Sequence, residues 1–156
     1  RGTHNFNELW TEMRVGSREW KGSATIHRGF FDLYEELRPE VCDLIRTRNV
    51  KLISGHSLGG VFAILAADDM RRIKNRYPHR TITIGTPQIG NADFVTLMDD
   101  ADIFRIYNEH DPIVRLPPLC KHVGTAIRLP LSANGLENHC LESYIDALSL
   151  KIDALS

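Results

Sequence analysis

The sequence predicts an α/β fold, in which a mainly parallel β-sheet is flanked by helices. Two observations lead to this prediction. Short apolar segments rich in β-branched residues alternate along the chain with longer segments whose apolar residues recur at helical spacing. Strands separated by helices need crossover connections, which make neighbouring strands parallel. The 156 residues suffice for one domain with a core of useful size, and no linker indicates a second domain.

The N-terminal part of the chain predicts two helices. Within residues 4–13, apolar side chains recur at the spacing of one helix face, namely Phe6, Leu9, Trp10 and Met13. A polar, glycine-containing stretch follows to about Gly22. From Phe30 to Ile45 a second apolar stripe has helical spacing, and we expect Pro39 to interrupt or kink that helix.

The middle of the chain predicts a strand followed directly by a helix. Residues 50–53 are short, apolar and rich in β-branched residues, which favours a buried strand. Residues 58–73 place apolar side chains at helical spacing. Basic side chains that suit the negative end of this helix dipole gather near its C-terminus, at Arg71, Arg72, Lys74 and Arg76.

The C-terminal part of the chain continues the alternation. Strands are predicted at 81–84, 103–107 and 125–129, and helices at 94–98 and 141–155.

Composition excludes several classes of protein. A net charge of −1 argues against a nucleic-acid partner, and no apolar run approaches a membrane span. The cysteines lack CxxC spacing, so we expect no metal or other cofactor; a Cys120–Cys140 disulfide and free thiols both stay open. Sparse cysteines and the absence of an Asn-x-Ser/Thr sequon favour an intracellular location.

The glycine-rich segment 53–60, ISGHSLGG, contains the pattern G-x-S-x-G around Ser57. This pattern marks a nucleophilic serine when a strand precedes it and a helix follows it, and both are predicted here. We expect Gly55 and Gly59 to remove β-carbons that would collide in the sharp turn, and Gly60 to let the helix approach its neighbour. The alternative is an ordinary strand–helix turn with an incidental serine.

A nucleophilic serine needs a base and an acid that orients the base. In parallel-sheet hydrolases these follow the serine in the order acid, then histidine. Asp111 follows the predicted strand 103–107 and is the preferred acid, although Asp-Pro is also good turn chemistry and Glu109 is a nearby rival. His139 follows the last predicted strand and can reach the same sheet edge, whereas His122 precedes that strand and should lie at the opposite edge.

The reaction also needs donors for the oxyanion. One expected donor is the backbone N–H of Leu58, directly after the serine. The other must come from an earlier loop, for which the chain offers Thr3.

Ordered sequence blocks along nearly the whole chain resemble the class 3 lipase family, the fungal-type triacylglycerol lipases of the α/β-hydrolase fold. The blocks lie at residues 1–3, 26–30, 53–60, 85–94, 108–118 and 139–144. In the same order, they resemble the family's segments F-R-G-[ST], V-H-x-G-F, the nucleophile elbow, G-x-P-R-V-G-N-x-x-F, N-x-x-D-x-V-x-x-L-P-P and H-x-x-x-x-Y. Gln88 departs from the family's usual arginine, which we interpret as structural drift.

The resemblance implies roles for single residues. Ser57 would attack an ester carbonyl, His139 would shuttle the proton and Asp111 would orient the imidazole, while Thr3 and Leu58 would hold the oxyanion. It further implies that His27 and His56 are structural. The apolar residues Phe6, Leu9, Trp10 and Met13 occupy the place of the family's lid, which covers the site or meets a lipid surface; a helix packed permanently on the core is the alternative.

The resemblance also bears on the extent of the domain. It implies one class 3 lipase domain over residues 1–156, an α/β-hydrolase-type sheet without the family's N-terminal strands. The strand at 50–53 would then become an exposed apolar edge.

The implied substrates are lipid or other acyl esters. Within catalysis the alternatives are a phospholipase A1 or galactolipase and a short-chain or feruloyl-type esterase, because motifs do not encode acyl-chain or head-group preference. A lipase-like interaction module without activity is the alternative outside catalysis. No pattern specifies an oligomeric state.

Overall fold

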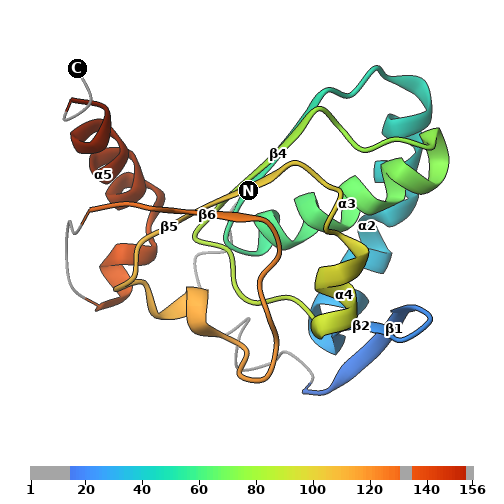
Figure 1. Cartoon of the computed structure of the whole chain (residues 1–156), viewed down its shortest axis with the longest axis horizontal. Helices are drawn as coiled ribbons and strands as arrows, with labels where there is room; N and C mark the ends of the chain where they lie inside the picture. Colours follow the sequence, from blue (N-terminus) through green and yellow to red (C-terminus); the bar gives the residue numbers. More distant parts are fainter. Residues whose placement is uncertain (1–14, 131–134, 154–156) are drawn as a thin grey trace.

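A four-stranded parallel sheet forms the centre of the fold (Figure 1). The computed structural model describes residues 15–130 and 135–153. Strands pair side by side in chain order, all in parallel. They are β3 (Leu52–His56), β4 (Arg80–Ile84), β5 (Ile103–Tyr107) and β6 (Thr125–Arg128). The predicted α/β class with a parallel sheet is confirmed.

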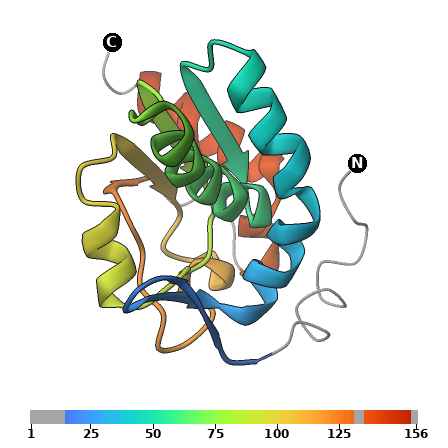
Figure 2. The same ribbon diagram turned by 90° about the vertical axis from the view of Figure 1, so that its right-hand side faces the viewer.

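Helices cover both faces of this sheet (Figure 2). The longer helices α2 and α3 lie on one side together with α4, and α5 lies on the other. Their bounds are α2 (Arg28–Thr47), α3 (Leu58–Lys74), α4 (Ala92–Leu97) and α5 (Leu141–Asp153), with short 3-10 helices η1 (Pro112–Arg115) and η2 (Gly135–His139).

Three features of the N-terminal half differ from the sequence analysis or go beyond it. The polar stretch before Gly22 is part of an antiparallel hairpin, formed by β1 (Ser17–Lys21) and β2 (Ala24–His27). Helix α2 continues through Pro39 to Thr47, so the expected interruption at Pro39 does not occur. The strand expected at 50–53 begins two residues later, at Leu52. It is not buried as its apolar sequence favoured, but it lies at the edge of the described sheet with Leu52 54% exposed, as the resemblance implied.

The apolar core has two parts. The larger joins the hairpin, α2, α3 and α4, with the fully buried side chains Ile26, Phe30, Tyr34, Leu65 and Phe94 at its centre. The smaller lies under α5, where Tyr144 and Ala147 pack with Leu129, Ile84 and Ile106.

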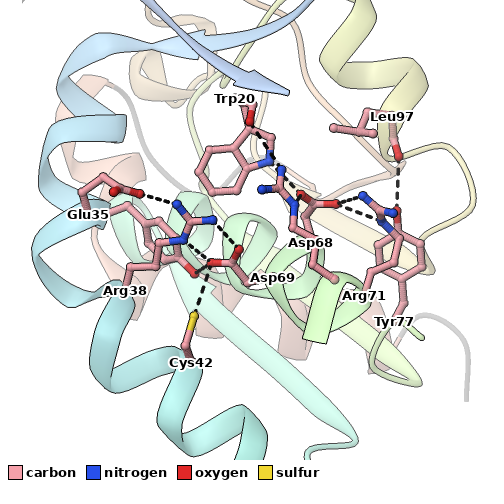
Figure 3. Close-up of polar contacts among 11 residues, drawn as sticks. Trp20, Glu35, Arg38, Cys42, Asp68, Asp69, Arg71, Tyr77 and Leu97 are labelled. Carbon is pink, nitrogen blue, oxygen red and sulfur yellow. Dashed lines mark hydrogen bonds and ion pairs between the residues drawn. The ribbon is translucent and has the colours of Figure 1, made fainter. Parts of the chain in front are cut away.

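A buried ion-pair cluster ties the hairpin to α2 and α3 (Figure 3). Two adjacent α3 carboxylates, Asp68 and Asp69, are 0% and 2% exposed. Arg38 of α2 donates to both Asp69 oxygens, at 2.7 and 2.8 Å. Arg71 donates to Asp68 from two nitrogens, and the Trp20 indole N–H of β1 donates to the same carboxylate at 2.7 Å.

This ion pairing revises the expected role of the basic residues near the end of α3. Arg71 and Arg72 bind Asp68 of their own helix rather than only suiting the helix dipole. The guanidinium carbons of Arg38 and Arg72 each lie 4.9 Å from the Trp20 ring centroid, a cation–π distance. Each buried carboxylate is thus paired and hydrogen-bonded, as burial of charge requires.

Two further findings concern thiols and membranes. All three cysteines are free, so the Cys120–Cys140 disulfide that the sequence left open is not formed. In the described ranges, every helix is too short or too polar to cross a membrane.

Candidate active site

Ser57 occupies a strained turn between β3 and α3. Its backbone φ is 57° and ψ is −125°, in the positive-φ region that costs free energy for a residue with a side chain. The Ser57 N–H donates to the Ile84 carbonyl at 2.8 Å, which fixes the turn to the end of β4. The structure therefore has the strand–turn–helix context that the motif requires.

Two of the three glycines in this turn have the steric role that we expected. A β-carbon at Gly55 would overlap the Gly59 carbonyl, and one at Gly60 would overlap the Thr86 hydroxyl. The expectation for Gly59 was wrong, because a β-carbon there would meet no atom within 4 Å.

Asp111 lies in the loop after β5 and is fully buried. It begins η1, where its Oδ1 accepts the Ile113 N–H at 2.9 Å. Its Oδ2 lies 2.8 Å from Nδ1 of His139. Because a carboxylate only accepts hydrogen bonds, Nδ1 of His139 is assigned the proton.

His139 is the last residue of η2, and only Cys140 separates it from α5. Its Nε2 lies 2.8 Å from the Ser57 hydroxyl oxygen. With the proton on Nδ1, Nε2 presents a lone pair to the hydroxyl, which donates to it. The structure thus brings together the three residues singled out by the sequence, in an arrangement able to activate a hydroxyl for attack.

The rival candidates lie elsewhere. Glu109 forms an ion pair with Arg128. His122 lies 2.7 Å from the Val114 carbonyl oxygen through its Nε2. Burial, aided by the charge of Arg105, lowers the pKa of His122 to about 4.

A second set of contacts, not assigned from the sequence, surrounds the three residues. The Tyr144 hydroxyl donates to Asp111 Oδ2 at 2.7 Å and accepts the Asn108 N–H at 3.2 Å. Burial and the charge of Asp111 raise the pKa of Tyr144. The Asn108 side chain donates to Asn138 at 2.9 Å and so links the acid loop to η2. The spacing His-x-x-x-x-Tyr is the sequence signal that points to Tyr144.

Two histidines expected to be structural differ in their surroundings. His27 is 8% exposed and stacks near Phe30, and burial lowers its pKa. His56, the residue before the serine, lies 2.8 Å from the His139 carbonyl oxygen through its Nε2. It therefore contacts the site directly.

Of the remaining predicted site residues, only Leu58 lies in the part of the chain that the structure describes. Leu58 is the first residue of α3, a position whose backbone N–H has no acceptor within the helix, and it directly follows the serine. Thr3 and the candidate lid residues lie outside the described residues, namely Phe6, Leu9, Trp10 and Met13.

An uncharged cavity of about 740 Å³ lies between the hairpin and the loop after η1. The described residues that line it do not include Ser57, Asp111 or His139, and none of them is Asp, Glu, Lys or Arg. Among the described residues, no group of three or more His, Cys, Asp or Glu side chains could hold a metal ion.

Comparison with known proteins identifies relatives that are named lipases and phospholipases. The family model described as "Lipase (class 3)" matches residues 1–121. A secreted mono- and diacylglycerol lipase of Fusarium solani is 32% identical over 130 residues, which are 76% of this chain and 38% of that protein. A chloroplastic phospholipase A1 of Arabidopsis thaliana, DAD1, is 32% identical over 107 residues, 59% of this chain and 24% of that protein.

A solved structure extends the likeness to the fold. It is a triacylglycerol lipase whose catalytic centre is formed by a serine protease triad, and it superposes with a TM-score of 0.70 at 26% identity. The superposition covers 83% of this chain and 55% of that one. The chain spans about two fifths of the length of the Fusarium solani relative, at 38%.

Proposed function

Because the chain belongs to the class 3 lipase family, we propose that it hydrolyses carboxylic esters of lipids through an acyl-serine intermediate. The observation that supports this proposal is the continuous hydrogen-bonded chain from Ser57 through His139 to Asp111, with both distances at 2.8 Å. The strained backbone at Ser57 adds support, because strain of this kind gathers at functional sites.

In the proposed first step, Ser57 Oγ bonds to the ester carbonyl carbon while Nε2 of His139 takes the hydroxyl proton. Asp111 stabilises the imidazolium that forms, and the Leu58 N–H faces the oxyanion of the tetrahedral intermediate. The bond to the alcohol oxygen then breaks, and His139 returns the proton to the departing alcohol. Water repeats the sequence on the acyl-serine and releases the carboxylic acid. Thr3 remains the proposed second oxyanion donor.

Acylglycerols are the first proposed substrate class, because the Fusarium solani relative is a mono- and diacylglycerol lipase. Phospholipids cleaved at the sn-1 ester are the second, because the Arabidopsis thaliana relative is a phospholipase A1. Either substrate implies contact with a lipid surface.

Labelling with a fluorophosphonate probe tests the proposal. We expect the probe to label Ser57, and Ser57→Ala to abolish labelling and lower kcat on p-nitrophenyl esters on the order of 10⁶-fold. Ser54→Ala is the matched control, because Ser54 lies on β3, three residues before Ser57, but is exposed. The Ser54→Ala variant should be labelled by the probe and should hydrolyse the esters at the rate of the unmodified chain.

Folded protein that shows neither labelling nor ester turnover would contradict the enzymatic proposal and favour a lipase-like interaction module. With activity established, diacylglycerol emulsions and phosphatidylcholine vesicles of matched acyl chains separate the two substrate classes. Esters of short and long acids separate an esterase from a lipase.

A further inference from the structure

We infer that His56 is a positioning residue for the reaction proposed above, holding the backbone of His139 against the strand that carries the nucleophile. The inference rests on the proposed function, because positioning His139 affects catalysis only if His139 is the base. It goes beyond that function because it assigns a task to a residue that neither binds substrate nor exchanges the reacting proton.

The contact that supports this role is a hydrogen bond between two histidines. Nε2 of His56 lies 2.8 Å from the carbonyl oxygen of His139. A carbonyl oxygen only accepts, so Nε2 of His56 carries a proton and donates it. The two imidazole rings also face each other, with centroids 4.9 Å apart and planes inclined by 32°. His56 therefore contacts both the backbone and the ring of the proposed base.

The position of His56 in the chain gives this contact its effect. His56 is the last residue of β3, and Ser57 follows it directly. The strand carrying the nucleophile is thus joined to His139 twice, through Ser57 Oγ and through His56 Nε2. The Ser57 bond must break in every cycle as the serine is acylated. The His56 bond takes no part in proton transfer and persists while the acyl-serine exists.

The surroundings of His56 favour a neutral donor. Burial lowers its pKa, and the charge of the adjacent His139 lowers it further. The hydrogen bond to the His139 carbonyl and the charges of Asp111 and Glu142 act in the opposite direction, and the pKa remains lowered. The ring of Tyr144 from α5 packs at a centroid distance of 6.0 Å. A neutral imidazole can hold the His139 carbonyl without placing a second cation beside the imidazolium that forms during the reaction.

Two substitutions separate the hydrogen bond from the ring. His56→Phe keeps a flat ring against His139 but removes the donor, whereas His56→Gln keeps an N–H donor at similar reach and removes the imidazole. We expect His56→Phe to lower kcat about 10- to 100-fold with KM within about twofold, since misplacement of a catalytic group has costs of this order. His56→Gln should retain kcat within a few-fold.

The matched control is His122→Phe. His122 also bonds a backbone carbonyl through Nε2, that of Val114 at 2.7 Å, but lies outside the proposed site. It should lower the melting temperature and leave kcat nearly unchanged. Equal loss of kcat in His122→Phe and His56→Phe, or in both His56 variants, would overturn the inference. So would an unchanged kcat in His56→Phe.

A second measurement does not depend on turnover. The proton between His139 Nδ1 and Asp111 should give a downfield ¹H NMR resonance that is sharp in the unmodified chain and in His56→Gln, and broadened or lost in His56→Phe. An inactive chain with this pattern would count against the proposed function and still support the positioning of His139. An active chain whose resonance is unchanged in His56→Phe would overturn the positioning and leave the function standing.

Discussion

Asp111 is a fully buried carboxylate held by three hydrogen-bond donors. They are the Ile113 N–H, His139 Nδ1–H and the Tyr144 hydroxyl, at 2.7 to 2.9 Å. Hydrogen bonds to a charged group are stronger than those between neutral groups, and an unpaired buried charge is costly. The three donors therefore both retain the charge of Asp111 inside the protein and aim it at the imidazole.

Tyr144→Phe removes one of these donors. We expect it to lower the free energy of unfolding by about 1.5–3 kcal/mol, the range for a hydrogen bond to a charged acceptor. It should also lower kcat on p-nitrophenyl esters, because Asp111 becomes freer to move. Urea unfolding measures the first effect. Tyr77→Phe is the control, because the Tyr77 hydroxyl donates to the neutral Leu97 carbonyl at 3.2 Å. A larger loss of stability in Tyr77→Phe would contradict the argument.

The sequence was informative about which residues gather at this site and uninformative about how they are supported. Parallel strands end at a common edge, so the chain order Ser57, Asp111, His139 was enough to place three loops together. The contacts of Tyr144 and His56 depend on side-chain rotamers and on the approach of η2 to β3. The spacing His-x-x-x-x-Tyr pointed to Tyr144 itself, but no local pattern encodes the distant groups that Tyr144 and His56 contact, so these contacts were not predicted.

At the scale of elements, α3 carries two adjacent buried charges in its middle. Asp68 binds arginines of its own helix, and Asp69 binds Arg38 of α2. The Asp69 pair therefore contributes to the packing of α2 on α3, beyond what the apolar faces supply.

Asp69 accepts hydrogen bonds from Arg38 and from the Tyr34 hydroxyl, and without its charge Arg38 keeps only the ion pair with Glu35. Asp69→Asn should therefore lower the free energy of unfolding by about 2–3 kcal/mol, within the range for hydrogen bonds to a charged group. Asp102→Asn is the matched control, because Asp102 pairs with Arg80 at 3.2 Å with both side chains about half exposed. It should cost about 1 kcal/mol or less. Urea unfolding of both variants measures the two losses of stability. Equal losses would contradict the argument that the Asp69 pair contributes more than an exposed pair.

Element prediction succeeded where residues that favour strands stand together in the sequence. The strand at 103–107 was predicted with its observed bounds, since IFRIY is rich in β-forming residues. The β1 strand SREWK buries only Trp20, so its sequence lacks the alternation that would reveal it. The strand predicted at 50–53 ends instead at His56, because backbone pairing with β4 carries it through Gly55.

At the scale of the whole molecule, β3 forms an edge of the sheet. In the described ranges only β4 pairs with it, and Leu52 and Ser54 are exposed. An edge strand of this kind offers unpaired backbone groups to another chain. For a chain of these 156 residues we therefore expect concentration-dependent self-association through β3.

Leu52→Lys should reduce this association, because a charge on an edge strand opposes pairing. Light scattering against protein concentration measures the change. Leu150→Lys is the control, since Leu150 is exposed to a similar extent, 56% against 54%, but lies on α5. Equal reduction by the two substitutions would show general solubilisation by charge and contradict pairing at β3.

The order of the site residues along the chain has a consequence for biosynthesis. Ser57 and His139 are 82 residues apart, and the turn holding the serine leaves the ribosome long before the histidine does. On the proposed mechanism a nascent chain that stops short of His139 holds a nucleophile without a base. Folding must also close these long-range contacts late, which is slow compared with forming local ones. On that mechanism, acyl transfer can begin only after synthesis has passed η2.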